Sequence, residues 1–358
     1  MDIKSLINCF QIKGEIKEAL PFGSGHINET FRLINKDTCG KDYLLQKINH
    51  HIFKDVDGMM NNIHLVCQHL EEVFAKESDQ ESLEVILSIK GKPFVRDSEG
   101  CYWRMFDFKS ELISYDIAET PEQIFEGARS FGIFMRSLAD FPVEKLVDTI
   151  PDFHHVGFRI RNLRVAVEED KVNRVKECKE LIDYAFSVTE SVSRIQKAGE
   201  QGLIPMRVTH NDTKFNNVLL TKRGKGRCVI DLDTVMPGYV HYDFGDGIRT
   251  TVCTAPEDEE DLEKIVLDME RFEAFAAGFL AETRESLGEK EIELLAVSGA
   301  LFAYLMGIRF LTDYLEGDIY YKTHFAGQNL QRAKAQLYLC KRILAEEKEL
   351  TEIIQKYI

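Results

Sequence analysis

The hydrophobic pattern of this chain changes once, near residue 120, and this change constrains the fold more than any other feature of the sequence. Before it, short stretches with strand-like alternation are separated by turn-rich segments, with one helical stretch among them. After it, the pattern is that of long helices, interrupted by a compact strand–turn–strand segment at 207–233. The change predicts an α+β chain with a small, mixed β-rich lobe and a larger, mainly helical lobe.

The expected elements follow this division. Pro121 at a first helical position, with acidic residues after it, marks the start of the helical part. Because 358 residues suggest two domains or lobes, we expect lobes at 1–108 and 109–358. The first should hold strands at 30–34, 43–48, 84–88, 93–96 and 102–108 and a helix at 56–75, and the second helices at 121–140, 166–200, 257–286, 289–316 and 329–355.

Charge and cysteine content exclude several classes of protein. With 45 basic and 60 acidic side chains, the net charge of −15 argues against a nucleic-acid partner, which needs a basic surface. The eight cysteines form no C-x-x-C pair and are typical of a reducing compartment. The N-terminus lacks the apolar core of a signal peptide, and the apolar run at 300–308 is too short for a bilayer. We therefore expect a cytoplasmic protein without a membrane partner.

The chemistry of this chain is expected in the segment at 207–233. An apolar strand at 218–220 and a returning strand at 227–230 should form a hairpin around a glycine-rich turn. The hairpin would bring Asp231 back beside Asn217, and Asp212 lies in the loop just before the first strand.

These residue types are those that phosphoryl transfer requires. One carboxylate must accept or orient the proton of an attacking hydroxyl, while a second carboxylate and an amide oxygen hold Mg²⁺ against a triphosphate. His210, Asp212 and Asn217 have the His-x-Asp-x-x-x-x-Asn spacing of a protein-kinase catalytic loop. An acidic turn that merely caps its neighbouring strands is the alternative, and the attached hairpin with Asp231 argues against it.

Asp243-Phe244-Gly245 spells the motif that binds Mg²⁺ in protein kinases. It follows Asn217 at a distance, beyond Pro237 and Gly238, whereas Asp231 ends the hairpin directly. We therefore assign the metal to Asp231 and expect Asp243 to have a structural role, such as a helix N-cap.

The chain resembles the aminoglycoside phosphotransferase and choline kinase superfamily of protein-kinase-like small-molecule kinases, and within it the N-acetylhexosamine 1-kinases. The matching pieces span most of the chain in order: 22–28 (FGSGHIN), 209–217 (THNDTKFNN), 230–234 (IDLDT) and 309–320 (RFLTDYLEGDIY). The resemblance implies a protein-kinase-like bilobal fold, in which 1–108 binds nucleotide and 109–358 carries the catalytic loop and the sugar-binding helices. It also implies ATP-dependent, Mg²⁺-dependent phosphorylation of the anomeric hydroxyl of GlcNAc or GalNAc.

The resemblance also implies roles for single residues. It makes Asp212 the catalytic base and Asn217 and Asp231 the metal ligands. It places four residues near the sugar: His26, Asp233, Arg309 and Tyr320. We expect Gly23, Gly25 and Gln46 at the nucleotide, with the two glycines in a loop whose backbone amides approach the ligand; the alternative for the glycines is an ordinary hairpin turn.

Two positions depart from the wider kinase pattern: Gln46, and His64 in the following helix, which stands near where a lysine-pairing glutamate is expected. Gln46 stands where a phosphate-binding lysine normally points inward, and alternation along the strand sends Lys47 to the opposite face. The N-acetylhexosamine 1-kinases also tolerate Gln there. The group that meets the α- and β-phosphates therefore stays open.

Arg309, Asp313, Glu316 and Tyr320 share one face if their helix continues, and such a polar stripe suits sugar hydroxyls. The alternative is an Arg309–Asp313 salt bridge on a solvated face, and Gly317 would end the helix early and leave Tyr320 in a loop.

Two other functions compete with a sugar kinase. A kinase of the same superfamily acting on an amine, such as an aminoglycoside, choline or homoserine, would need an acidic or aromatic cage, whereas Arg309 favours a neutral polyol. A nucleotide-binding pseudokinase is the other alternative, but such proteins usually lack one of the three residues Asp212, Asn217 and Asp231. The expected partners are thus ATP and a small sugar; the sequence says nothing of the oligomeric state.

Overall fold

The computed structural model describes residues 3–23, 28–76 and 79–358. The chain divides into two compact units, and three segments far apart in the sequence make up each of them. Unit 1 comprises Met1–Tyr115, Ser137–Pro151 and Asn216–Pro237, and unit 2 comprises Asp116–Arg136, Asp152–Phe215 and Gly238–Ile358. This division differs from a single boundary after residue 108, because two later segments pack with the N-terminal residues.

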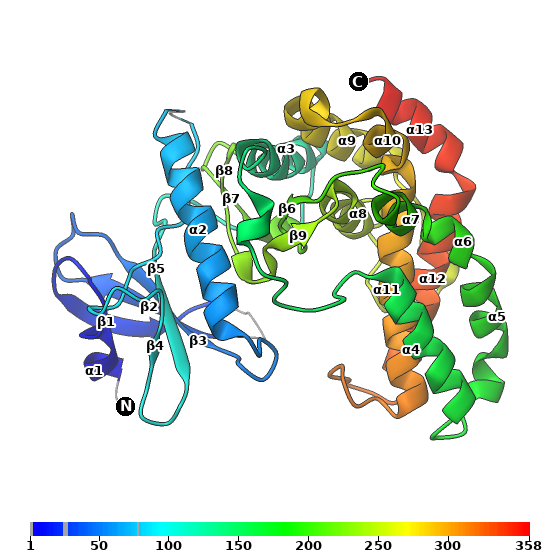
Figure 1. The fold of residues 1–358 in the computed structure, drawn as a ribbon, viewed down its shortest axis with the longest axis horizontal. Helices are drawn as coiled ribbons and strands as arrows, with labels where there is room; N and C mark the ends of the chain where they lie inside the picture. The colour runs from blue at the N-terminus through cyan, green and yellow to red at the C-terminus, as the bar shows by residue number, and fades with distance from the viewer. Residues whose placement is uncertain (1–2, 24–27, 77–78) are drawn as a thin grey trace. The chain divides into compact units, whose positions relative to one another are not determined.

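Unit 1 is built on a sheet of five strands in the order β1-β2-β3-β5-β4 (Figure 1). All four pairings between neighbours are antiparallel, so the sheet is not mixed. The segment at 84–88, expected to be a strand, makes only the isolated bridges of Val85 with Phe106 and of Ser88 with Phe10. The elements of this unit are α1 (Ile3–Ile7), β1 (Ile16–Pro21), β2 (Glu29–Asn35), β3 (Tyr43–Ile48), α2 (Val56–Phe74), β4 (Val95–Arg96), β5 (Tyr102–Asp107), β7 (Val218–Leu220) and β8 (Gly226–Val229).

Alternation along the strands gives the sheet two different faces. One face carries an apolar core in which Leu45 and Met105 pack with Leu6 and Phe10 from the N-terminal segment. Because successive side chains of a strand point to opposite sides, Gln46 and Arg104 belong to the other face. There the Arg104 guanidinium reaches Met60 of α2.

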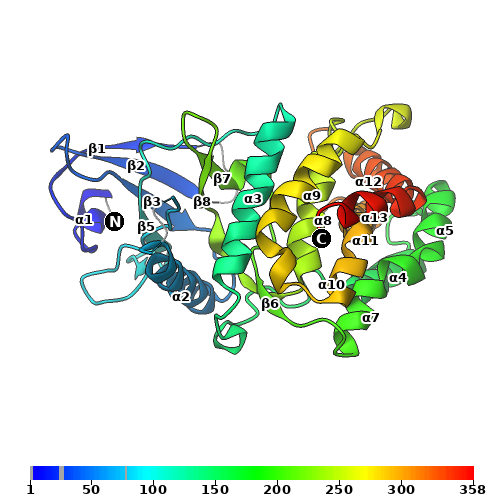
Figure 2. The same ribbon diagram turned by 90° about the horizontal axis from the view of Figure 1, so that it is seen from above.

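Unit 2 is helical, and α11 (Leu295–Glu316) is its central element (Figures 1 and 2). It packs against α4, α8, α12 and α13. It is long and apolar enough to cross a membrane, but most of its apolar stretch is buried among these helices, as in a core helix. The remaining elements of the chain are α3 (Pro121–Ser137), α4 (Val156–Glu169), α5 (Lys179–Ser187), α6 (Thr189–Val192), α7 (Arg194–Glu200), β6 (Arg207–Thr209), β9 (Met236–Gly238), α8 (Val240–Thr251), α9 (Met269–Thr283), α10 (Glu289–Glu293), α12 (Gln328–Ala345) and α13 (Glu347–Gln355).

The α+β fold with a β-rich part and a helical part is confirmed, but two long helices were wrongly predicted. The stretch 166–200 breaks because α4 ends at Glu169. Its C-cap residue Asp170 has a left-handed backbone, and so has Asn173, at φ 58°. The stretch 257–286 is helical mainly in α9, because the Asp268 carboxylate caps that helix by accepting the Arg271 N–H at 3.1 Å.

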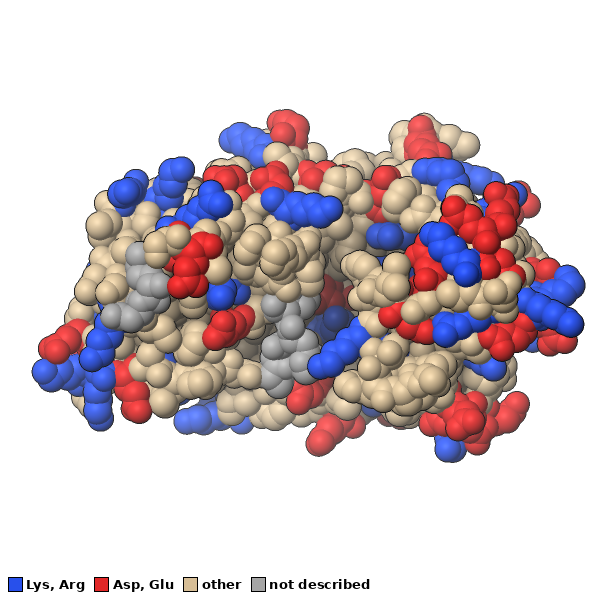
Figure 3. Space-filling model, turned by 90° about the horizontal axis from the view of Figure 1, so that it is seen from below, with Lys and Arg blue, Asp and Glu red and all other residues tan. Residues whose placement is uncertain are grey.

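The surface charges are intermixed. On the face that Figure 3 shows, basic and acidic side chains lie beside one another over both units. The net charge of −15 is therefore not gathered into one acidic patch on that face.

A buried histidine joins α8 to α10. His241 is fully buried, and its Nε2–H donates to the Glu291 carbonyl at 2.8 Å. Its Nδ1 has no hydrogen-bond partner within the described residues. Burial lowers the pKa of His241 to about 4, so the folded protein keeps this ring neutral.

Replacing His241 should make stability less sensitive to acid. Burial of the neutral His241 ring stabilises the fold fully above pH 6.5, where the histidine of the unfolded chain is also neutral. This stabilisation is lost as the pH falls toward 4, because the unfolded chain gains a proton that the folded protein does not. At pH 5 this loss is about 2 kcal/mol of unfolding free energy. His241→Gln keeps a donor for Glu291 but does not titrate, so its Tm should fall less than that of the wild type between pH 7 and pH 5. Exposed His51 offers a control: His51→Gln should follow the wild type. Parallel Tm curves for wild type and His241→Gln would contradict the prediction.

Candidate active site

The loop at 210–214 follows β6 in unit 2, and buried polar contacts hold it. Ahead of the loop, Arg207 is fixed by Glu291, whose two carboxylate oxygens accept from Nε and Nη2 at 2.7 Å each. His210 is fully buried, with its ring edge-on to Phe131 and Phe134 at centroid distances of 5.4 and 5.7 Å. His210 is thus a packed part of the loop's base.

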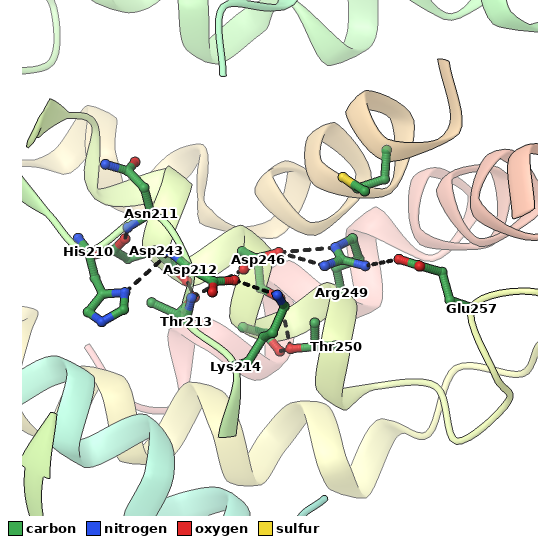
Figure 4. Close-up of polar contacts among 12 residues, drawn as sticks. His210, Asn211, Asp212, Thr213, Lys214, Asp243, Asp246, Arg249, Thr250 and Glu257 are labelled. Carbon is green, nitrogen blue, oxygen red and sulfur yellow. Dashed lines mark hydrogen bonds and ion pairs between the residues drawn. The ribbon is translucent and has the colours of Figure 1, made fainter. Parts of the chain in front are cut away.

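Asp243 fixes the backbone of the same loop (Figure 4). Its carboxylate accepts the N–H groups of His210 at 2.9 Å and Asn211 at 2.8 Å, and its carbonyl accepts the Thr213 hydroxyl at 2.6 Å. Burial raises the pKa of Asp243 to about 6, against the effect of these two N–H donors. The expected structural role is therefore seen, but Asp243 is not the N-cap of α8, because that position belongs to Tyr239.

Gly245 of the same motif lets this helix pack closely within unit 2. A Cβ at this glycine would lie 2.5 Å from the Ser298 carbonyl oxygen of α11. The glycine thus permits close packing of α8 on α11, and Asp243-Phe244-Gly245 serves the helix core of unit 2.

Asp212 lies at the end of a charged network (Figure 4). Lys214 Nζ is 2.8 Å from Asp212 Oδ1. Asp246 accepts the Thr213 N–H at 3.2 Å, and its Oδ1 accepts from Arg249 Nε and Nη2 at 3.0 and 2.9 Å. Arg249 Nη1 also donates to Glu257 at 3.2 Å, so two cations and three carboxylates are gathered on and behind the loop.

The pKa values in this network follow from burial and charge together. Burial by itself would lower the pKa of Lys214, but Asp212 and Asp246 outweigh it and raise that pKa. Burial would raise the pKa of Asp246, but Arg249 and Lys214 outweigh it and lower that pKa. Both groups are thus held in their charged forms. Sequence reasoning gave no role to Lys214, Asp246 or Arg249; the i, i+3 spacing of the last two was the available signal.

In unit 1, the hairpin brings together the two residues that were predicted to hold metal. The Ile230 N–H donates to the Asn217 carbonyl at 2.9 Å, and Val218 pairs with Val229. Asp231 follows directly, with a left-handed backbone at φ 60°. The described residues contain no cluster of three or more His, Cys, Asp or Glu side chains suited to a metal. One carboxylate and one amide instead suit a hard cation that takes its remaining oxygen ligands from phosphates and water.

The structure places the other predicted residues of unit 1 as follows. Gly23 has φ +81° and open space around it, while Gly25 and His26 lie outside the described residues. Gln46 donates to Thr30 Oγ1 at 3.1 Å and accepts from Arg104 Nε at 2.9 Å. Asp233 is buried and ion-paired with Arg104, so this carboxylate is engaged inside unit 1.

A cavity of about 210 Å³ in unit 2 brings Arg309 and Tyr320 together. The alternative Arg309–Asp313 salt bridge does not form within the described chain. Asp313 instead accepts the backbone N–H groups of residues 319–321 at 2.7–3.0 Å. Gly317, at φ +104°, ends α11, and Tyr320 lies in the following loop. The cavity is lined by Arg159, Asn162, Ile308, Arg309, Thr312, Asp313, Glu316, Tyr320 and Tyr321.

Sequence reasoning missed Arg159 and His154. Neither Arg159 nor Arg309 forms an ion pair with any residue that the structure describes, and Arg159 Nε is a buried donor without a partner. Arg309 lies over the ring of Phe153 at 5.7 Å, and the neighbouring His154 lies 3.3 Å from the Asn211 carbonyl through Nε2. The cavity is therefore connected to the 210–214 loop through Phe153 and His154.

Comparison with known proteins agrees with this arrangement. Residues 18–279 match the phosphotransferase enzyme family. An aminoglycoside phosphotransferase from Alicyclobacillus acidocaldarius is 12% identical, with a TM-score of 0.65 over 98% of this chain and 97% of that chain. An amicoumacin kinase solved with AMP-PNP and Ca²⁺ is 10% identical, with a TM-score of 0.62 over 96% and 94%. A choline kinase from Streptococcus pneumoniae is 12% identical, with a TM-score of 0.52 over 92% and 94%.

At these identities the solved structures show the fold alone. The family match is different in kind, because it covers more than half of the chain and includes the 210–214 loop, the hairpin and α8. The chain belongs to the phosphotransferase enzyme family.

Proposed function

We propose that this protein is a kinase that transfers the terminal phosphoryl group of ATP to the anomeric hydroxyl of an N-acetylhexosamine, GlcNAc or GalNAc. The observation that carries the kinase activity is the 210–214 loop, in which buried contacts from Asp243 and Asp246 fix Asp212 beside a cation. The amicoumacin kinase of the same fold was solved with a nucleotide analogue and a divalent cation, which supports ATP and a divalent metal here.

Asp212 would act as the base. It would accept or orient the proton of the acceptor hydroxyl, and Lys214 would balance the negative charge beside it. Asn217 and Asp231 would hold Mg²⁺ through their side-chain oxygens. Bound there, the metal would neutralise charge on the ATP phosphates.

The cavity at Arg309 supports a hydroxyl-rich acceptor. Arg159 Nε and the Tyr321 hydroxyl are buried there without partners, and sugar oxygens would satisfy them. An amine would meet two guanidinium groups. Of the two carboxylates in the lining, Asp313 is engaged by backbone N–H groups, and Glu316 lies 3.8 Å from Lys171 Nζ. This charge balance favours a neutral sugar over the amine-bearing alternative.

The pseudokinase alternative fits less well. Asp212, Asn217 and Asp231 are all present, and the hairpin brings the last two together. A protein that only bound nucleotide would not need Asp212 held by the buried contacts of its loop.

Asp212→Asn should fold normally and lose most turnover. A positioned general base contributes about 10²–10⁴-fold to rate, so kcat should fall within that range while MgATP binding changes little. The measurement is ADP release with GlcNAc or GalNAc. Asp183 forms a comparable, exposed pair with Lys179 at 2.9 Å in α5, so Asp183→Asn is the matched control and should keep full activity. Near-full activity of Asp212→Asn would remove this residue from the mechanism.

The acceptor is tested by the position of the new phosphate and by Arg309. ³¹P–¹H coupling should place the phosphate on C1 of the hexosamine.

Arg309→Ala should raise the sugar KM about 10–100-fold, because a hydrogen bond to a charged group is worth roughly 1.5–3 kcal/mol. The KM for ATP should change little. Exposed Arg164 also lies over an aromatic ring, that of Phe186, but does not line the cavity, so Arg164→Ala should leave both values unchanged. Product phosphorylated only at C6, or turnover only with amines such as choline, would contradict the proposal.

A further inference from the structure

Arg104 is a buried cation on the face of the sheet where a kinase normally carries its phosphate-binding lysine. Its side chain is 2% exposed, and Gln46 is its cross-strand partner in the β3–β5 pairing. Arg104 Nε donates to Gln46 Oε1 at 2.9 Å, while Nη1 forms a charge-assisted bond with Asp233. The guanidinium therefore joins the sheet to the segment that follows Asp231.

The turn after Asp231 is held at two further points. Asn28 Nδ2 donates to the second oxygen of Asp233 at 2.9 Å. Fully buried Asn62 of α2 donates to the Val235 carbonyl at 3.0 Å. Within unit 1, the 3₁₀ turn Leu232–Thr234 is thus fixed by contacts from the sheet side and from α2.

Stability alone does not explain a buried pair of this kind. Removing two charges from water is costly, and apolar pairs of similar volume are often as stable or more stable. What Arg104 adds is geometry, because a planar guanidinium bonded through Nε and Nη1 sets the direction as well as the distance of its partners. Asp231, two residues before Asp233, has a left-handed backbone and is the N-cap residue of this turn, so its position is tied to that of the turn.

We propose that Arg104 is a positioning residue which, through Asp233, fixes the turn that carries Asp231 and so sets the affinity for metal-bound nucleotide. The inference rests on the proposed function only in taking Asp231 as a metal ligand. It assigns Asp233 to this ion pair, where the resemblance had placed it near the sugar.

The test separates stability from nucleotide affinity. Arg104→Met or Asp233→Asn alone leaves one buried charge unpaired, so each should lower Tm strongly. The double variant Arg104→Met/Asp233→Asn removes both charges and should recover most of the lost Tm. Its Kd for MgATP, measured without acceptor, should still be raised by about 10–100-fold, the usual effect of losing a partner of a metal ligand. The acceptor KM at saturating MgATP should not change.

Two further variants complete the experiment. Lys36 and Glu15 form an exposed pair in unit 1, at 3.1 Å, so Lys36→Met/Glu15→Gln should keep the wild-type Kd for MgATP. Arg104→Lys keeps the charge but not the two-point contact; it should fold and still bind MgATP more weakly than wild type. Wild-type affinity in either the double variant or Arg104→Lys would overturn the inference. If wild-type protein bound no MgATP, the proposed function would fail instead.

Discussion

The proposed catalytic site depends on one contact: the buried Asp243 carboxylate accepts hydrogen bonds from two backbone N–H groups. They fix His210 and Asn211, and Asn211 has a left-handed backbone at φ 64°. Leaving a buried N–H unpaired costs roughly 1–3 kcal/mol, so the loop and α8 hold one another in place. Asp212 follows directly, and its position is therefore set by a helix that comes later in the sequence. Asp246, on the same helix, holds the next peptide N–H, that of Thr213.

The parts that sequence could predict are those governed by local rules. The α+β division followed from a change of periodicity, and the hairpin that joins Asn217 to Asp231 followed from two apolar strands around a glycine-rich turn. The interpretation of Asp243 as structural also followed from chain position, since it lies well beyond the hairpin. These features depend on neighbours in sequence, which a single chain displays directly.

The parts that sequence could not predict depend on partners distant in the chain. Asp313 was expected to face a ligand or pair with Arg309. It lines the cavity, but its carboxylate accepts the backbone N–H groups of 319–321, because Gly317 reverses the chain there. The buried pair that Asp233 forms with Arg104, from a strand in the first third of the chain, likewise had no signal in the sequence. Local spacing carries no information about such pairings, which arise only when the units fold.

The central claim is that the hairpin carboxylate, and not the carboxylate of the Asp-Phe-Gly segment, serves the metal. The most direct test is calorimetric binding of ATP with and without Mg²⁺. The account predicts that wild-type protein binds ATP more tightly with Mg²⁺, that Asp231→Ala loses this difference, and that Asp243→Asn keeps it with a lower Tm. Loss of the Mg²⁺ effect in Asp243→Asn, together with its retention in Asp231→Ala, would contradict the account.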